Sequence, residues 1–68
     1  MRVLIIEDSL VGRLLHTVLE RDGHEPVLVD NGTDGWRVLT APAAPPELLI
    51  LDRMLPDVDG ADLLARLR

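Results

Sequence analysis

Three carboxylates stand where they could act together on a metal ion or a phosphoryl group. Glu7 and Asp8 directly follow the apolar run at residues 3–6, and Asp52 directly follows a second apolar run at residues 48–51. If both runs are neighbouring parallel strands, their carboxyl ends open into one crevice. Carboxylates gathered there repel one another unless a cation lies among them, and Mg²⁺ prefers oxygen ligands. We therefore expect a magnesium site at Glu7, Asp8 and Asp52, although any one of them alone is more simply explained as a solvated loop residue or a helix cap.

The two apolar runs are the elements that must position these carboxylates. Val3–Ile6 and Leu48–Leu51 are continuous rather than alternating, which is typical of parallel strands that are buried on both faces. Pro26–Val29 is a weaker run, and its proline cannot donate a hydrogen bond in mid-sheet, so we expect an edge strand there. The other two strands are predicted to be central and adjacent.

Helical patterns separate the strands. A first helix is predicted between Ser9, its N-cap, and Gly23, where it stops. A second, short helix follows the turn at residues 31–32 and precedes a stiff connection rich in proline and alanine at residues 41–46, and a third helix is predicted at residues 62–68. The apolar stripe of the first helix consists of Leu10, Val11, Leu14, Leu15, Val18 and Leu19, and the second helix carries Trp36, Val38 and Leu39.

The order of these elements, a strand followed by a helix three times, predicts an open parallel α/β sheet. Because the crossover connections are right-handed, the strand order should be 2-1-3, with the first helix on one face and the second on the other. A chain of 68 residues is short for a domain, so we expect one small domain or part of one.

Composition excludes several function classes. The chain has a formal charge of −5 and a single aromatic residue, Trp36, which gives a nucleic-acid surface almost no support. The absence of cysteine excludes disulfides and thiolate metal sites and fits a reducing environment. The N-terminal apolar run ends at Glu7, far short of a signal peptide or a membrane span. We therefore expect a cytoplasmic chain that binds neither nucleic acid nor membrane.

Two segments resemble the receiver domain of two-component response regulators. They are Ile5-Ile6-Glu7-Asp8-Ser9 after the first strand and Leu51-Asp52-Arg53-Met54-Leu55-Pro56-Asp57-Val58-Asp59-Gly60 after the third. The resemblance implies a flavodoxin-like fold and Asp52 as the phosphoacceptor. It further implies Mg²⁺ held by Glu7, Asp8, Asp52 and the backbone carbonyl of Met54. The implied phosphoryl donor is a phosphohistidine of a sensor kinase or a phosphotransfer protein.

The resemblance covers only the first half of such a domain. Residues 1–68 would hold its first three βα units, with the third helix cut short. In the family, a hydroxyl residue after the fourth strand and a lysine after the fifth contact the phosphoryl group, whereas this chain contains no lysine. We therefore expect metal binding to survive in this chain, but not the switch that phosphorylation drives.

Three other function classes are an interaction unit, a dinucleotide-binding enzyme and a phosphatase. The chain could keep the fold as an interaction or dimerisation unit that does not accept phosphate. A dinucleotide-binding enzyme would need Gly-x-Gly-x-x-Gly after the first strand, where residues 7–12 read EDSLVG. A phosphatase of the haloacid dehalogenase type would need a second aspartate in place of Met54. Neither requirement is met, so we expect a phosphoacceptor rather than an enzyme.

Four further polar residues have simpler roles or stay open. Arg53 could meet incoming phosphate or extend into solvent. His16 is predicted to be a boundary or surface residue beside the apolar stripe of the first helix rather than to accept a phosphoryl group. Asp57 and Asp59 are predicted to be turn and helix-start residues near Gly60 rather than additional metal ligands.

The predicted strand order leaves one edge of the strand at residues 48–51 without a neighbour. An unpaired apolar edge invites pairing with another chain. We therefore expect a homo-oligomer that covers this edge, or the C-terminal half of the domain in the same place.

Overall fold

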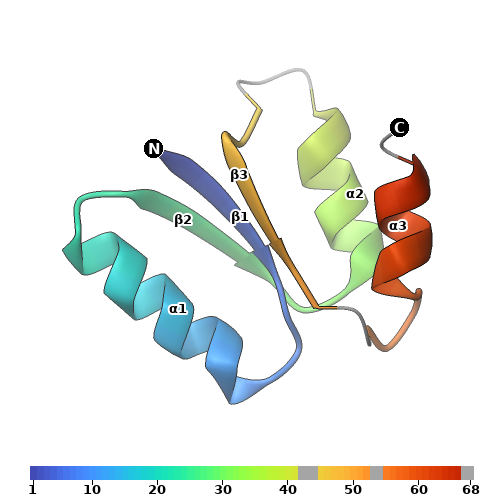
Figure 1. Cartoon of the computed structure of the whole chain (residues 1–68), viewed down its shortest axis with the longest axis horizontal. Coiled ribbons are helices and arrows are strands. Elements are labelled where there is room, and N and C mark those ends of the chain that lie inside the picture. The colour runs from blue at the N-terminus through green and yellow to red at the C-terminus, as the bar shows by residue number, and fades with distance from the viewer. Residues whose placement is uncertain (42–44, 53–54, 67–68) are drawn as a thin grey trace.

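The computed structural model describes residues 1–41, 45–52 and 55–66 and contains three strands and three helices in strict alternation (Figure 1). In chain order they are β1 (Arg2–Ile6), α1 (Leu10–Arg21), β2 (Glu25–Val29), α2 (Gly32–Thr40), β3 (Leu48–Leu51) and α3 (Gly60–Arg66). Part of the predicted proline-rich connection, residues 42–44, lies outside the described residues.

The strands form one parallel sheet in the order β2-β1-β3, which confirms the predicted topology. Ile5 at the middle of β1 lies opposite Leu28 of β2 and Ile50 of β3. Pro26 belongs to β2, which lies at one edge of the described sheet. An edge strand tolerates proline, which has no backbone N–H to donate to a neighbouring strand.

The helices cover both faces of the sheet. In Figure 1, α1 lies on one side of the strands, and α2 and α3 lie side by side on the other. Leu4 and Ile6 of β1 are fully buried and form the core together with Leu63 of α3. Val3 and Ile5 are equally buried, and since successive side chains of a strand alternate, they point to the α1 face.

Only β1 is buried on both faces as the sequence pattern predicted. In β3 three residues are half-buried, and Leu48 is 46 % exposed. The physical reason is the strand order, because within the described part of the chain β3 has a strand neighbour on one side only. The prediction that β3 is adjacent to β1 is confirmed, but the prediction that it is buried like β1 is wrong for this structure.

The apolar stripe of α1 is wider than the surface that covers it. Leu15 and Leu19 are half-buried against the sheet. The other four residues of the stripe are exposed, from 54 % for Val11 to 68 % for Leu10, with Leu14 and Val18 between these values. These four residues form the exposed row of α1. The predicted ends of α1 are confirmed, since the Ser9 side chain accepts a hydrogen bond from Val11 N and Gly23 has a φ of 85°.

The third helix begins earlier than the sequence pattern indicated. It starts at Gly60 rather than at Asp62, because Asp59 accepts a hydrogen bond from Ala61 N at 2.7 Å and caps the first turn. The predicted end at Arg68 lies outside the described residues. No helix in the described ranges has the length and the apolar character that a membrane span requires.

Candidate functional site

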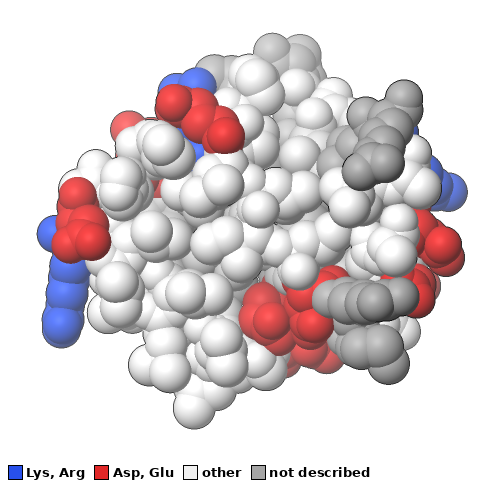
Figure 2. Space-filling model, in the orientation of Figure 1, with Lys and Arg blue, Asp and Glu red and all other residues white. Residues whose placement is uncertain are grey.

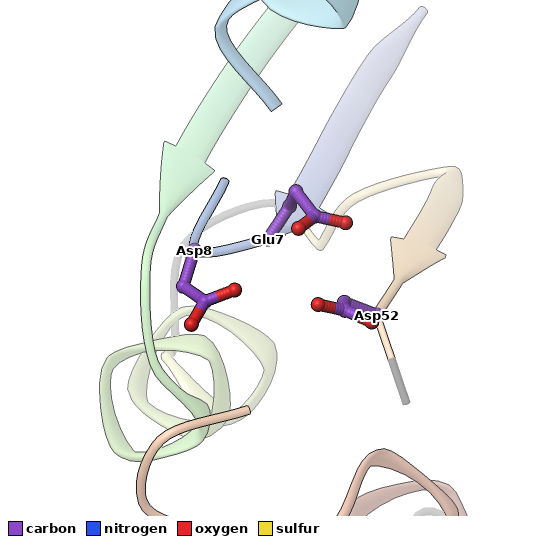
Figure 3. A group of neighbouring side chains, drawn as sticks. All are labelled: Glu7, Asp8 and Asp52. Carbon is purple, nitrogen blue, oxygen red and sulfur yellow. The ribbon is translucent and has the colours of Figure 1, made fainter. Parts of the chain in front are cut away.

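The three predicted carboxylates meet at the carboxyl end of the sheet. Glu7 and Asp8 follow β1, Asp52 follows β3, and each residue offers a carboxylate oxygen within 4.8 Å of the others. Figure 3 shows the three side chains converging on a common space between the strand ends. Glu7 and Asp52 are half-buried, whereas Asp8 is exposed. The structure therefore brings together the acidic residues that the sequence singled out.

The sheet itself holds Glu7 and Asp52 next to each other. The backbone N–H of Glu7 donates to Val29 O at 3.0 Å, and that of Asp52 donates to Ile6 O at 2.8 Å. These hydrogen bonds continue the two parallel ladders one residue past the strands. The side chains of Glu7 and Asp52 thus leave the backbone from fixed positions at neighbouring strand ends.

Ser9 constrains the side chain of Glu7. Its hydroxyl donates to Glu7 Oε1 at 2.8 Å, and its backbone N–H approaches the same oxygen at 3.2 Å. The hydroxyl oxygen also accepts from Val11 N at 3.3 Å, so one residue caps α1 and orients Glu7. The sequence predicts the cap but not the contact with Glu7, for which the Glu-x-Ser spacing is the available signal.

The cluster has the chemistry of a site for a hard divalent cation. It presents carboxylate oxygens from three residues, and Mg²⁺ prefers one or two carboxylates, a carbonyl and retained water. The donor set therefore fits this ion. Met54, whose carbonyl is the fourth implied ligand, lies outside the described residues, as does Arg53.

Asp57 has a role that the sequence did not reveal. Its carboxylate accepts hydrogen bonds from Gly32 N at 2.7 Å, Thr33 N at 2.9 Å and the Thr33 hydroxyl at 2.6 Å. The Thr33 hydroxyl, followed by the two backbone N–H groups, lowers the pKa of Asp57 from 3.8 to about 2. Asp57 thus lies in the predicted turn before α3 and also caps α2, whereas Asp59 is the helix-start residue of α3.

Two further residues, His16 and Trp36, lie half-buried in helices. His16 is half-buried on α1, in agreement with the predicted boundary position. Trp36 is half-buried against the core, and the guanidinium carbon of Arg66 lies 5.7 Å from the centroid of its ring. The indole therefore packs between the sheet and α3.

Comparison with known proteins gives concordant results. A family model described as the response regulator receiver domain matches residues 3–68. A probable transcriptional regulatory protein of Picosynechococcus is 42 % identical over an alignment of 73 positions, which covers 98 % of this chain and 29 % of that protein. The chain thus spans less than a third of that curated relative.

Two solved structures are similar in fold and sequence. The N-terminal domain of a response regulator receiver protein from Methanoculleus marisnigri has a TM-score of 0.84 and 33 % identity, covering 96 % of this chain and 52 % of that one. The Mn²⁺-bound form of the response regulator Rcp1 has a TM-score of 0.82 and 30 % identity, with 96 % and 52 % covered. The chain spans about half of each.

The hydrogen bonds of Asp57 should be visible in the pH dependence of stability. Its pKa is about 2 in the folded chain against an ordinary 3.8, so its stabilising contribution is fully present above pH 3.8 and is lost as the pH falls toward 2. The free energy of unfolding of Asp57→Asn should therefore be lower than that of the wild type at neutral pH and should fall less steeply through this window. Urea titrations at a series of pH values measure the free energy of unfolding of both proteins and its slope against pH. Asp59→Asn is the matched control, and a wild-type slope equal to that of Asp57→Asn would contradict the prediction.

Proposed function

The chain belongs to the response regulator receiver domain family, and from this premise we propose that it accepts a phosphoryl group on Asp52. In this proposal Glu7, Asp8, Asp52 and the backbone carbonyl of Met54 hold Mg²⁺. The observation that carries the proposal is the meeting of three carboxylates within 4.8 Å at the ends of β1 and β3. The response regulator Rcp1, which is similar in structure, has been solved in an Mn²⁺-bound form, and this supports the binding of a divalent ion.

The proposed reaction is a phosphoryl transfer between side chains. An Asp52 carboxylate oxygen forms a bond to phosphorus while the phosphorus–nitrogen bond of a phosphohistidine breaks, and the electron pair of that bond stays on the imidazole nitrogen. A bound Mg²⁺ would offset the negative charges of the carboxylate and the phosphoryl group, which otherwise repel. Ser9 would keep Glu7 turned toward the site throughout.

The proposal implies particular partners and a location. The donor is a sensor histidine kinase or a phosphotransfer protein, and the chain acts with it in the cytoplasm. The phosphoryl group stays on Asp52, so the chain serves as a signalling phosphoacceptor rather than as an enzyme that turns over a substrate.

A second candidate function is a protein interaction unit. The observation that favours it is apolar surface in two places, the exposed residues of α1 and the edge of β3 with the neighbouring α3, where Leu48 of β3 and Leu64 of α3 are 46 % and 43 % exposed. Figure 2 shows broad uncharged areas between scattered charged groups on one face of the molecule. Such a unit would bind a second copy of the chain or the remainder of a receiver domain without accepting phosphate.

We expect Asp52 alone to carry the phosphoryl group, because it directly follows β3 and lies beside the carboxylates of Glu7 and Asp8, whereas Asp57 and Asp59 are engaged as helix caps. In the natural protein, Asp52→Ala should take no label from acetyl phosphate or a cognate kinase with Mg²⁺, as read by intact mass. Asp59→Ala is the matched control and should be labelled normally. Labelling of Asp52→Ala at the wild-type stoichiometry would refute the assignment.

We expect Mg²⁺ binding to depend on Asp8, whose exposed carboxylate belongs to the cluster. Asp8→Ala should weaken the affinity of the natural protein for Mg²⁺ by at least about tenfold, because removing a charged ligand leaves two carboxylates. Calorimetry measures the change, and Asp30→Ala, which removes an exposed carboxylate outside the cluster, is the control. Equal affinities of wild type and Asp8→Ala would exclude this metal site.

We expect the isolated 68-residue chain to self-associate, because the edge of β3 and the exposed row of α1 leave apolar groups in water. Sedimentation at micromolar concentration should detect a dimer or a larger assembly. A folded monomer whose amides at residues 49–51 exchange slowly would be the contrary result.

A further inference from the structure

The first turn of α2 contacts two chain segments that lead to or from the acidic cluster. One segment is the end of β1, which leads into Glu7 and Asp8. The other is the loop at residues 55–59, which follows Asp52. Both segments contact the same turn of α2, through different residues and by different interactions.

The contact with the loop is made by Asp57. The first backbone N–H groups of a helix have no acceptor within the helix. In α2 the side chain of Asn31 accepts from Asp34 N at 2.8 Å, while the N–H groups of Gly32 and Thr33 donate to Asp57 instead. Asp57 is thus a second cap, supplied from 25 residues further along the chain.

The next loop residue tightens the same contact. A Cβ atom on Gly32 would lie 2.1 Å from Val58 Cγ2, so this close approach requires glycine. Val58 also packs against the core formed by Leu4, Ile6 and Leu63. Two consecutive residues of the loop therefore hold it against the start of α2.

The contact with β1 is equally close. A Cβ atom on Gly35 would lie 2.3 Å from Cδ1 of Ile6, which is fully buried and has no room to move. Ile6 directly precedes Glu7, and its carbonyl accepts from Asp52 N at 2.8 Å. The first turn of α2 is therefore packed on the residue from which the acidic pair extends.

We propose that Asp57 is a positioning residue for the acidic cluster. By holding the 55–59 loop against the first turn of α2, it fixes this loop relative to Glu7 and Asp8. This inference rests on the proposed function, because it assigns Asp57 to the metal site proposed there. Asp57 does not bind the ion itself, since its carboxylate is engaged with Gly32 and Thr33.

Asp59 provides the matched control. It lies in the same loop, carries the same charge, and caps a helix through a 2.7 Å hydrogen bond from Ala61 N. Its partner is the adjoining α3, so its loss removes a charge and a cap without releasing the loop from α2. A role of Asp57 that is merely that of a helix cap predicts equal effects for the two residues.

The experiment measures the affinity of the natural protein for Mg²⁺ alone by calorimetry, at a temperature where circular dichroism shows every variant to be folded. Asp57→Ala should raise the Kd by about tenfold, the scale typical of residues that orient metal ligands, and Asp59→Ala by less than about twofold. Thr33→Val, which removes only the 2.6 Å hydrogen bond, should raise the Kd by about threefold. It should have no further effect in the Asp57→Ala background, because both changes remove the same contact.

Each outcome decides the inference. A wild-type protein that binds Mg²⁺ while Asp57→Ala and Asp59→Ala have equal Kd values overturns the inference and leaves the proposed function standing. A wild-type protein without Asp8-dependent Mg²⁺ binding overturns both. If Asp57→Ala does not fold, Thr33→Val decides, and a Kd equal to that of the wild type overturns the inference.

Discussion

The mutual repulsion of three carboxylates is the constraint on which the rest of the structure depends. Their oxygens lie within 4.8 Å of one another, at a place where two of the three residues are half-buried. Like charges at this separation push the segments that carry them apart unless the backbone resists or a cation intervenes. The described structure supplies the resistance, and the proposed Mg²⁺ would supply the cation.

The resistance comes from backbone contacts on several sides of the cluster. Hydrogen bonds from Glu7 N and Asp52 N extend the two ladders beyond the strands, so Glu7 is tied to β2 and Asp52 is tied to β1, in which residues 3–6 are buried. Ser9 holds one oxygen of Glu7 from the α1 side. Gly35 lets α2 pack closely on Ile6 from the opposite face. The charged groups thereby extend from the most deeply buried part of the sheet.

Burial is distributed unevenly around this site. The α2 and α3 face holds the core cluster of Leu4, Ile6 and Leu63, whereas Leu15 and Leu19 in the apolar stripe of α1 are only half-buried and the rest of the stripe is exposed. Short chains bury a smaller fraction of their surface than long ones, so exposed apolar groups are expected at this length. Their concentration on α1 and at the edge of β3 marks where further protein surface would add most to stability.

The sequence by itself determined the elements and the identity of the acidic cluster. Continuous apolar runs, helical periodicity and the handedness of crossovers are local or general rules, and they led to the order 2-1-3 and to the meeting of Glu7, Asp8 and Asp52. The motif around Asp52 added the family. These features follow from short-range patterns that any chain with this fold must satisfy.

The tertiary structure alone decided which residues far apart in the chain contact each other. Asp57 caps α2 rather than α3, because α2 begins beside the loop and its first N–H groups need acceptors. The helix periodicity of α1 could not reveal which part of its apolar stripe the sheet covers. Such pairings depend on distances between residues far apart in the chain, and no local pattern encodes them.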